Sequence, residues 1–178
     1  MRKKILKISL VIFPILLIFS IFSYASGCST DWYITGYYTP DETQFIGSEE
    51  EILVDEKLEF YNSEFIIEVK TEGWGKATNG KYLGWYDNKF HLENKPLDYH
   101  GDYLQIKAVA ADPSVIPLGS QITIPDLPQP WNTYTFHVTD VGPSIIGKHI
   151  DVYTGEGNNA KNITEKITSK GQRVCIIS

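Results

Sequence analysis

Cysteine and basic residues are both scarce in this sequence of 178 residues. Its two cysteines are too few for a scaffold held by several disulfides or for a cysteine-rich zinc site. Lys and Arg number 16 against 22 Asp and Glu, which gives a formal net charge of −6. Because nucleic acids and anionic lipids attract clustered basic side chains, a chain this acidic is a poor partner for either. Nucleic acid is therefore excluded as a partner.

Long apolar runs are confined to one segment near the N-terminus, and that segment indicates an export signal. A basic start precedes an apolar run over residues 8–22, which is short for a membrane-spanning helix and typical of a signal peptide. Cleavage after Ala25 would release a soluble protein, whereas residues 25–28 resemble a lipobox, in which Cys28 would carry a lipid and attach the protein to a membrane. An uncleaved anchor is a third alternative. We expect a signal peptide over residues 1–27 and an exported protein, located in the periplasm or cell envelope or secreted.

The second cysteine, Cys175, lies in an apolar run near the C-terminus. If Cys28 is not acylated, an exported compartment permits a disulfide between the two cysteines, which would tie the ends of the chain together. The alternative is that Cys175 is a small, buried apolar side chain. Neither alternative indicates a nucleophilic thiol.

Short alternating apolar segments, separated by Gly and Pro, dominate the rest of the chain. We predict strands over residues 33–39, 65–69, 104–110, 121–124, 133–139, 149–153 and 173–177. The acidic segment 41–59 is predicted to be irregular, and one helix is predicted over 159–169. Many short strands with this punctuation favour an all-β fold, a closed barrel with short helices and loop insertions. Without a repeat or a linker, residues 28–178 are predicted to form one domain.

Three aspartates stand where strand-like segments begin or end: Asp112, Asp140 and Asp151. If the strands carrying Asp140 and Asp151 are neighbours, both carboxyls can face one cleft. Two carboxyls in one cleft repel each other when ionised, so one of them keeps its proton to a higher pH. A protonated carboxyl is what cleavage of a glycosidic bond requires, because the leaving oxygen must take up a proton. The alternative is that each aspartate only forms a turn or caps a loop.

A set of motifs around these aspartates resembles the three-aspartate (3D) domain family. The matching segments are residues 35–40, 75–78, 108–119, 139–142 and 146–153, in the order in which the family carries them. The family includes membrane-bound lytic transglycosylases and stationary-phase survival proteins. The resemblance implies a six-stranded double-psi β-barrel and an enzyme that cleaves the glycan strands of peptidoglycan.

The resemblance also implies a role for each aspartate. Asp151 matches the catalytic acid and base, Asp140 supports its orientation and protonation, and Asp112 lies close by. The implied reaction is not hydrolysis. Asp151 protonates the bond between N-acetylmuramic acid and N-acetylglucosamine, and the muramyl 6-hydroxyl then attacks its own anomeric carbon to give a 1,6-anhydro sugar. The family uses no metal and no cofactor, although His137 and His149 flank the aspartates and raise a metal site as a less favoured alternative.

The same resemblance suggests that Thr35, Tyr37 and Thr39 line the groove, and Trp74, Lys76 and Thr78 are further candidates for contact with the glycan. For Tyr37 and Trp74, packing in the core is an equal alternative. The chain departs from the family at Pro143, which removes a backbone donor after the Asp-x-Gly element. It is also shorter than the two-domain transglycosylases, so most of a second, substrate-gripping domain is expected to be missing.

The competing functional hypothesis is a non-catalytic glycan-binding or wall-loosening module, similar to expansins, built on the same barrel. Both hypotheses make peptidoglycan glycan strands the partner of a protein that we expect to be a monomer. They differ in whether Asp151 transfers a proton.

Overall fold

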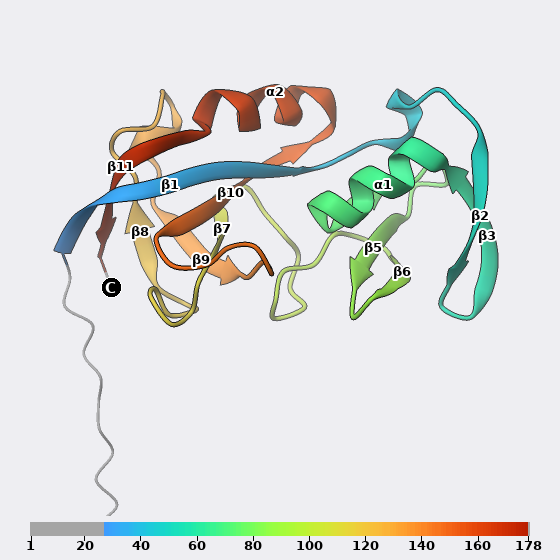
Figure 1. Ribbon diagram of the computed structural model, residues 1–178, viewed down its shortest axis with the longest axis horizontal. Helices are drawn as coiled ribbons and strands as arrows, with labels where there is room; N and C mark the ends of the chain where they lie inside the picture. Colours follow the sequence, from blue (N-terminus) through green and yellow to red (C-terminus); the bar gives the residue numbers. More distant parts are fainter. Residues whose placement is uncertain (1–26, 178) are drawn as a thin grey trace, which may run out of the picture.

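The computed structural model describes residues 27–177. The predicted signal peptide therefore lies outside the described residues, apart from Gly27. Within residues 27–177, no helix is both long and apolar enough to cross a membrane. The described chain forms two parts that lie side by side (Figure 1): a barrel, and a second sheet inserted between the first two barrel strands of the sequence.

The barrel is closed by six strands. In order around the barrel these are β1 (Gly27–Thr39), β10 (His149–Glu156), β7 (Ala108–Ala111), β9 (Phe136–Asp140), β8 (Gln121–Thr123) and β11 (Ser169–Ile176). Strand β1 is parallel to β10 and β7 is parallel to β9, whereas the other neighbours are antiparallel. The prediction of an all-β fold built on a six-stranded double-psi barrel is confirmed.

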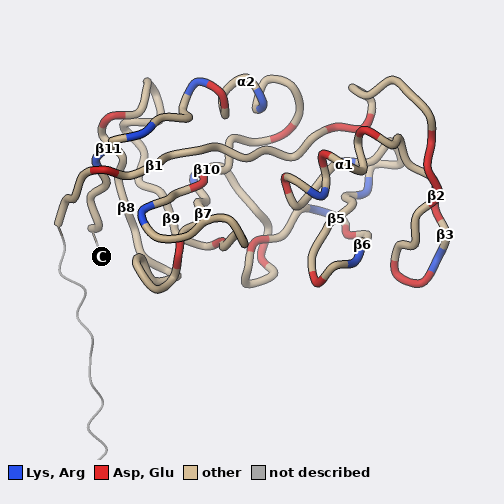
Figure 2. The backbone as a smooth tube through the Cα atoms, viewed as in Figure 1, with Lys and Arg blue, Asp and Glu red and all other residues tan. Residues whose placement is uncertain are grey.

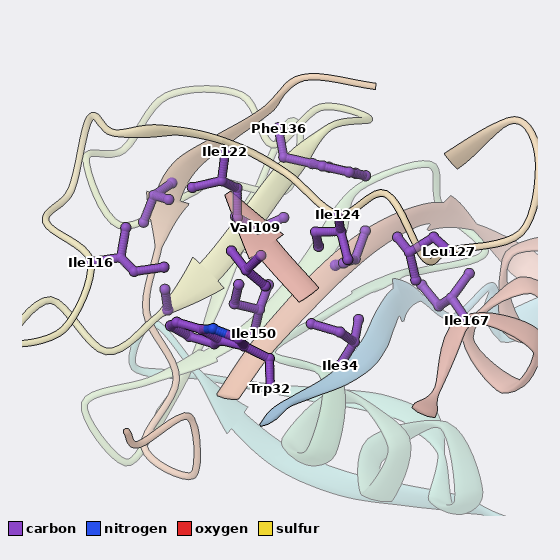
Figure 3. Packing of buried hydrophobic residues seen from close by; sticks show 14 of the residues in the cluster. Trp32, Ile34, Val109, Ile116, Ile122, Ile124, Leu127, Phe136, Ile150 and Ile167 are labelled. Atoms are coloured by element: carbon purple, nitrogen blue, oxygen red, sulfur yellow. The ribbon is translucent and has the colours of Figure 1, made fainter. Parts of the chain in front are cut away.

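Alternate side chains of these strands fill the barrel interior (Figure 3). Fully buried members of this core are Ile34, Val109, Ile122, Phe136, Val138, Ile150 and Val152. Successive side chains of a strand point to opposite faces. Because Ile150 and Val152 point inward, His149 and Asp151 lie on the outer face of β10.

The inserted part has a five-stranded sheet and its own core. Its strand order is β3 (Lys57–Asn62), β2 (Glu49–Val54), β6 (Lys89–Glu93), β5 (Tyr82–Tyr86) and β4 (Trp74–Lys76). Helix α1 (Ser63–Glu72) packs on this sheet and buries Phe65, Ile66 and Val69 against Leu83. This core contains none of the residues of the barrel core.

Two sequence-based predictions fail in the inserted part. Residues 65–69, predicted as a strand, belong to α1. The Asn62 side chain accepts hydrogen bonds from the backbone N–H groups of Glu64 and Phe65, at 2.9 and 3.2 Å, and this cap starts a helix despite the β-branched residues that follow. Segment 41–59, predicted as irregular, contains the short helix η1 (Glu42–Gln44), the whole of β2 and the first residues of β3.

Helix α2 (Gly157–Ile167) lies against the barrel and confirms the predicted helix to within two residues at each end. It packs on β1 beside Gly36, where an added Cβ would stand 2.9 Å from the Cα of Thr164. Only glycine allows this close approach. A further short helix, η2 (Trp131–Thr133), precedes β9.

A disulfide joins Cys28 of β1 to Cys175 of β11. The two residues are directly opposite each other in the ladder and are separated by 147 positions in the sequence. Of the alternatives for the second cysteine, the disulfide is the one that the structure contains. The bond links the first and the last strand of the barrel.

Polar contacts hold the inserted sheet against the barrel. The Tyr82 hydroxyl donates to Oε1 of Glu156 at 2.9 Å, and Nζ of Lys161 lies 3.0 Å from Oε1 of Glu68. The backbone N–H of Tyr38 donates to Oε2 of Glu72 at 3.1 Å. These contacts fix the two parts relative to each other, so the space between them is a defined groove.

Candidate active site

The groove between the two parts has a volume of about 820 Å³. Its lining includes Tyr37, Glu72, Trp85, Tyr99, Asp140 and Asp151. The lining contains five carboxylic acids and one basic residue, Lys70. Acidic residues are spread over both parts of the molecule (Figure 2), and the groove is therefore an acidic site within an acidic protein.

One row of residues across four barrel strands places the two groove aspartates. In the strand register, Thr35 of β1 is opposite Asp151 of β10, Asp151 is opposite Ala110 of β7, and Ala110 is opposite Asp140 of β9. Strands are roughly 4.8 Å apart, so the Cα atoms of the two aspartates are about 10 Å apart. Ala110, which stands between them in this row, carries only a methyl group and lines the groove together with both aspartates.

An irregularity in the ladder turns Asp140 toward this row. Val109 is opposite Val138, but Ala110 is opposite Asp140, so β9 has one extra residue, Thr139, at this point. Without it, Asp140 would share the inward orientation of Val138 and Phe136. The bulge re-aims the carboxyl, as bulges beside functional sites commonly do.

Asp151 is partly buried and keeps its proton unusually well. Burial raises its pKa from 3.8 to about 6. A hydrogen bond from the Thr35 hydroxyl to Oδ1, at 2.6 Å, acts in the opposite direction, and the negative charge of Asp140 adds to the increase. A carboxyl with a pKa near 6 can donate a proton at mildly acidic pH and accept one afterwards.

Asp140 is held in place by two donors. The Tyr37 hydroxyl donates to Oδ2 and the backbone N–H of Val141 donates to Oδ1, each at 2.9 Å. Burial nevertheless raises the pKa of Asp140, and the negative charge of Asp98 adds to the increase. Burial, with the charge and hydrogen bond of Asp140, likewise raises the pKa of Tyr37.

A third carboxyl in the groove, Glu72, comes from the inserted part. It is near the C-terminal end of α1, and its Oε2 accepts the Tyr38 backbone N–H described above. Burial raises its pKa from 4.5 to about 7, and the charge of Asp151 adds to the increase. Nothing in the local sequence around Glu72 distinguishes it from the other acidic residues of its segment, because its position depends on packing between distant elements.

The structure brings together some of the residues expected in the site and not others. Asp140, Asp151 and Tyr37 line the groove, and Thr35 contacts Asp151 directly. The remaining expected residues are outside the lining: Asp112, Thr39, Lys76 and Thr78. Pro143, the departure from the family pattern, does line the groove beside Asp140.

Each expected residue outside the lining has a structural partner. Asp112 accepts the backbone N–H of Gly147 at 2.8 Å and contacts Ser114, so it supports the connection that follows Asp140. Thr39 pairs with the Tyr153 hydroxyl at 3.0 Å, and Nζ of Lys76 is 3.8 Å from Glu156. The backbone N–H of Thr78 donates to Glu42.

Aromatic side chains of the inserted part line the groove, and among them the sequence analysis named only Trp74 as a candidate for glycan contact. Trp85, Tyr86 and Tyr99 line the groove together with Trp74, and Tyr86 and Tyr99 are exposed there. The density of Trp and Tyr over residues 82–103 is the one signal that the sequence offers for them. Within residues 27–177, no group of three or more His, Cys, Asp or Glu could hold a metal ion.

Comparison with known families gives one match. The model of the 3D domain matches residues 107–176, which span β7 to β11 of the barrel together with α2. No curated protein sequence matches the chain.

Comparison with solved structures gives matches to lytic transglycosylases. MltA of E. coli with bound chitohexaose is 15% identical with a TM-score of 0.65, over 83% of this chain and 71% of that one. A membrane-bound lytic murein transglycosylase of Agrobacterium tumefaciens is 11% identical with a TM-score of 0.59, over 85% and 76%. LtgG of Burkholderia pseudomallei is 15% identical with a TM-score of 0.52, over 85% and 76%. At these identities the likeness shows the fold.

These matches extend beyond the barrel. A shared region of 83% of the chain is much larger than the barrel, so the likeness includes the inserted sheet. The expectation that most of a second, substrate-gripping domain is missing stays a prediction. The acidic segment that was predicted as irregular instead forms part of the sheet that bounds the groove from the other side.

Proposed function

We propose that the protein is an exported peptidoglycan lytic transglycosylase that cleaves the bond between N-acetylmuramic acid and N-acetylglucosamine, and the match of residues 107–176 to the 3D domain supports this. The observation that carries this proposal is the position of Asp151, a carboxyl with a pKa of about 6 in a groove shared with a second aspartate. The fold shared with lytic transglycosylases supports the same reaction class.

In the proposed reaction a single carboxyl serves twice. Oδ1 of Asp151 is engaged by Thr35, so Oδ2 is the oxygen that gives its proton to the glycosidic oxygen as the bond breaks. The carboxylate that results then accepts the proton of the muramyl 6-hydroxyl while this oxygen bonds to the anomeric carbon. The products are a 1,6-anhydromuramyl end and a free N-acetylglucosamine 4-hydroxyl. Asp151 ends protonated as it began, and no water is consumed.

Asp140 assists through its charge and its fixed position. It raises the pKa of Asp151, which increases the fraction of the acid that is protonated before the glycan binds. The negative charges of both aspartates also favour the positive charge that develops at the anomeric carbon when the bond breaks. Hydrogen bonds from Tyr37 and Val141 hold the Asp140 carboxylate in the groove, where its charge can act on the bound glycan.

The groove is suited to a chain of sugar rings. Aromatic faces bind the apolar faces of sugars, and Trp85, Tyr86 and Tyr99 stand along it opposite the barrel. The E. coli MltA structure holds chitohexaose, a chain of N-acetylhexosamine units, and this supports a glycan of the same chemistry for the present groove. A monomer is sufficient, because both walls come from one chain.

We also propose that the protein acts outside the cytoplasm. The disulfide supports an oxidising compartment. A sulfur that is bonded to Cys175 cannot carry a thioether lipid at the same time, so the disulfide-bonded form is not anchored through Cys28. The mass of the mature N-terminus distinguishes the acylated protein from the disulfide-bonded one.

The test is digestion of purified sacculi followed by mass spectrometry of the released fragments. The wild-type protein should release anhydromuropeptides, and Asp151→Asn should release none. Asp31→Asn is the matched control, because Asp31 is an exposed residue outside the groove, with a φ of 66° that asparagine also tolerates. If the wild-type protein binds sacculi but releases no product, the enzyme proposal is refuted and a non-catalytic glycan-binding module is favoured.

A further inference from the structure

The outer faces of β1 and β10 carry a hydrogen-bonded chain that ends on Asp151. Nε2 of His149 lies 2.9 Å from the Thr35 hydroxyl, and the Thr35 hydroxyl lies 2.6 Å from Oδ1 of Asp151. The strand register produces this chain, because Thr35 is opposite Asp151 and Tyr33 is opposite His149. The Tyr33 ring stacks on the His149 ring, with centroids 4.7 Å apart, and holds the imidazole in place.

The single hydrogen of the Thr35 hydroxyl allows only two arrangements of this chain. In the first, Nε2–H of His149 donates to Thr35, and Thr35 donates to Oδ1 of Asp151. In the second, protonated Oδ1 of Asp151 donates to Thr35, and Thr35 donates to an unprotonated Nε2. A protonated Asp151 carries its proton on Oδ2 in the first arrangement and on Oδ1 in the second.

We propose that His149 is a positioning residue that acts through Thr35: by donating from Nε2, it commits the Thr35 hydrogen to Oδ1 and keeps the transferable proton of Asp151 on Oδ2. The proposal deepens the proposed function and rests on it for its catalytic consequence. His149 does not touch the glycan. It selects which oxygen of the acid is ready to react.

The direction of the second hydrogen bond assigns the donor of the first. Because the Thr35 hydroxyl donates its hydrogen to Oδ1 of Asp151, Nε2 of His149 must supply the hydrogen of its own contact with Thr35. Burial lowers the pKa of His149, and a hydrogen bond with the Ser144 backbone acts in the opposite direction. Nζ of Lys170 lies 5.2 Å from the centroid of the Tyr33 ring, on which His149 stacks, and Nζ of Lys148 donates to the Thr30 carbonyl. A neutral imidazole can donate from Nε2 without the positive charge that would lower the pKa of Asp151.

The groups that face Asp151 from other elements act differently. The charge of Asp140 on β9 raises the pKa of Asp151, and the charge of Asp151 in turn raises the pKa of Glu72 on α1. Neither group is bonded to Oδ1. Among the described residues, the Thr35 side chain is the one that is hydrogen-bonded to Asp151, and His149 is hydrogen-bonded to Thr35 in turn.

Two substitutions separate this role from a structural one. His149→Phe keeps a ring on Tyr33 but removes the N–H donor, whereas His149→Gln keeps an N–H donor at similar reach. We expect His149→Phe to lower kcat by about tenfold with little change in KM, in line with one lost hydrogen bond. We expect His149→Gln to retain most of the wild-type kcat. If His149→Phe does not fold, as judged by circular dichroism, His149→Met replaces it.

A second measurement does not depend on activity. Carbon-detected NMR of the glycan-free protein follows the titration of the Asp151 carboxyl directly. His149→Phe should raise the pKa of Asp151, since Thr35 is then free to turn its hydrogen away, and it should have no further effect when Thr35 is already replaced by Val. The proposal is overturned if His149→Phe changes neither kcat nor this titration, or if it acts equally in the Thr35→Val background.

The two measurements also distinguish this proposal from the proposed function. If the wild-type protein releases no anhydro product but its Asp151 titration responds to His149→Phe, the coupling is real and the enzyme assignment fails. If the protein releases product and His149→Phe leaves both readouts unchanged, the enzyme stands and His149 has no positioning role.

Discussion

Replacing Asp151 by Asn should make the protein more stable at neutral pH while it abolishes the proposed activity. In the folded protein, burial raises the pKa of Asp151 from 3.8 to about 6. Between these values the folded state keeps a proton that the unfolded state releases, so the free energy of unfolding falls as the pH rises from about 4 to 6. Each unit of pKa corresponds to about 1.4 kcal/mol, so ionised Asp151 costs the folded protein about 2–3 kcal/mol at pH 7. Asn removes this cost and still accepts the Thr35 hydrogen bond.

The assay is urea denaturation followed by tryptophan fluorescence, for wild type, Asp151→Asn and the control Asp31→Asn, at pH values from 3.5 to 8. The free energy of unfolding of Asp151→Asn should equal that of wild type at pH 3.5 and exceed it by about 2–3 kcal/mol above pH 7. Asp31→Asn should show no such trend. A variant that is less stable than wild type at pH 7, or a difference that does not depend on pH, would refute the assignment of Asp151 as a buried carboxyl with a raised pKa.

Three further predictions concern other parts of the site and fold. Glu72→Gln should stabilise the protein above pH 7 and not at pH 4, because burial raises the pKa of Glu72 from 4.5 to about 7. The same denaturation series measures this difference, and a variant equal in stability to wild type at all pH values would contradict the prediction. Ala110→Leu should reduce anhydromuropeptide release at least tenfold, because the larger side chain fills space between the two aspartates, while the circular dichroism spectrum stays native. Undiminished release would show that the glycan does not pass between the aspartates. Reduction of the Cys28–Cys175 disulfide should lower the free energy of unfolding by about 5 kcal/mol, since the bond closes a loop over 147 positions. The double Ser variant, which reductant cannot change, is the control.

The barrel could be predicted from the sequence because its strands alternate. Segments 121–124 and 149–153 each carry inward Ile or Val residues at every second position, and both became strands at nearly these positions. The inserted part could not be predicted in the same way. A run such as Phe65-Ile66-Ile67 fits a strand as well as a helix, and the Asn62 cap and packing against the sheet decide between them.

Two carboxyls of the candidate site were predictable from the sequence, but the geometry that brings them together was not. The motifs identified Asp140 and Asp151, and the structure places both in one groove. The motifs could not show that an extra residue in β9 turns Asp140 outward, because a bulge depends on the register between two strands. Nor could they show Glu72 in the opposite wall, since its neighbours in space are far from it in sequence.

The parallel pairing of β1 with β10 has a consequence for when the protein becomes active. Thr35 and Asp151 are separated by 116 positions, and they meet only after a strand that begins at His149 has joined the sheet. A chain that crosses a membrane N-terminus first therefore carries no assembled site until almost all of the described polypeptide has emerged. If the proposed function holds, forms of the chain that end before Asp151 would have no activity on peptidoglycan, and the activity would arise only when β10 has joined the barrel.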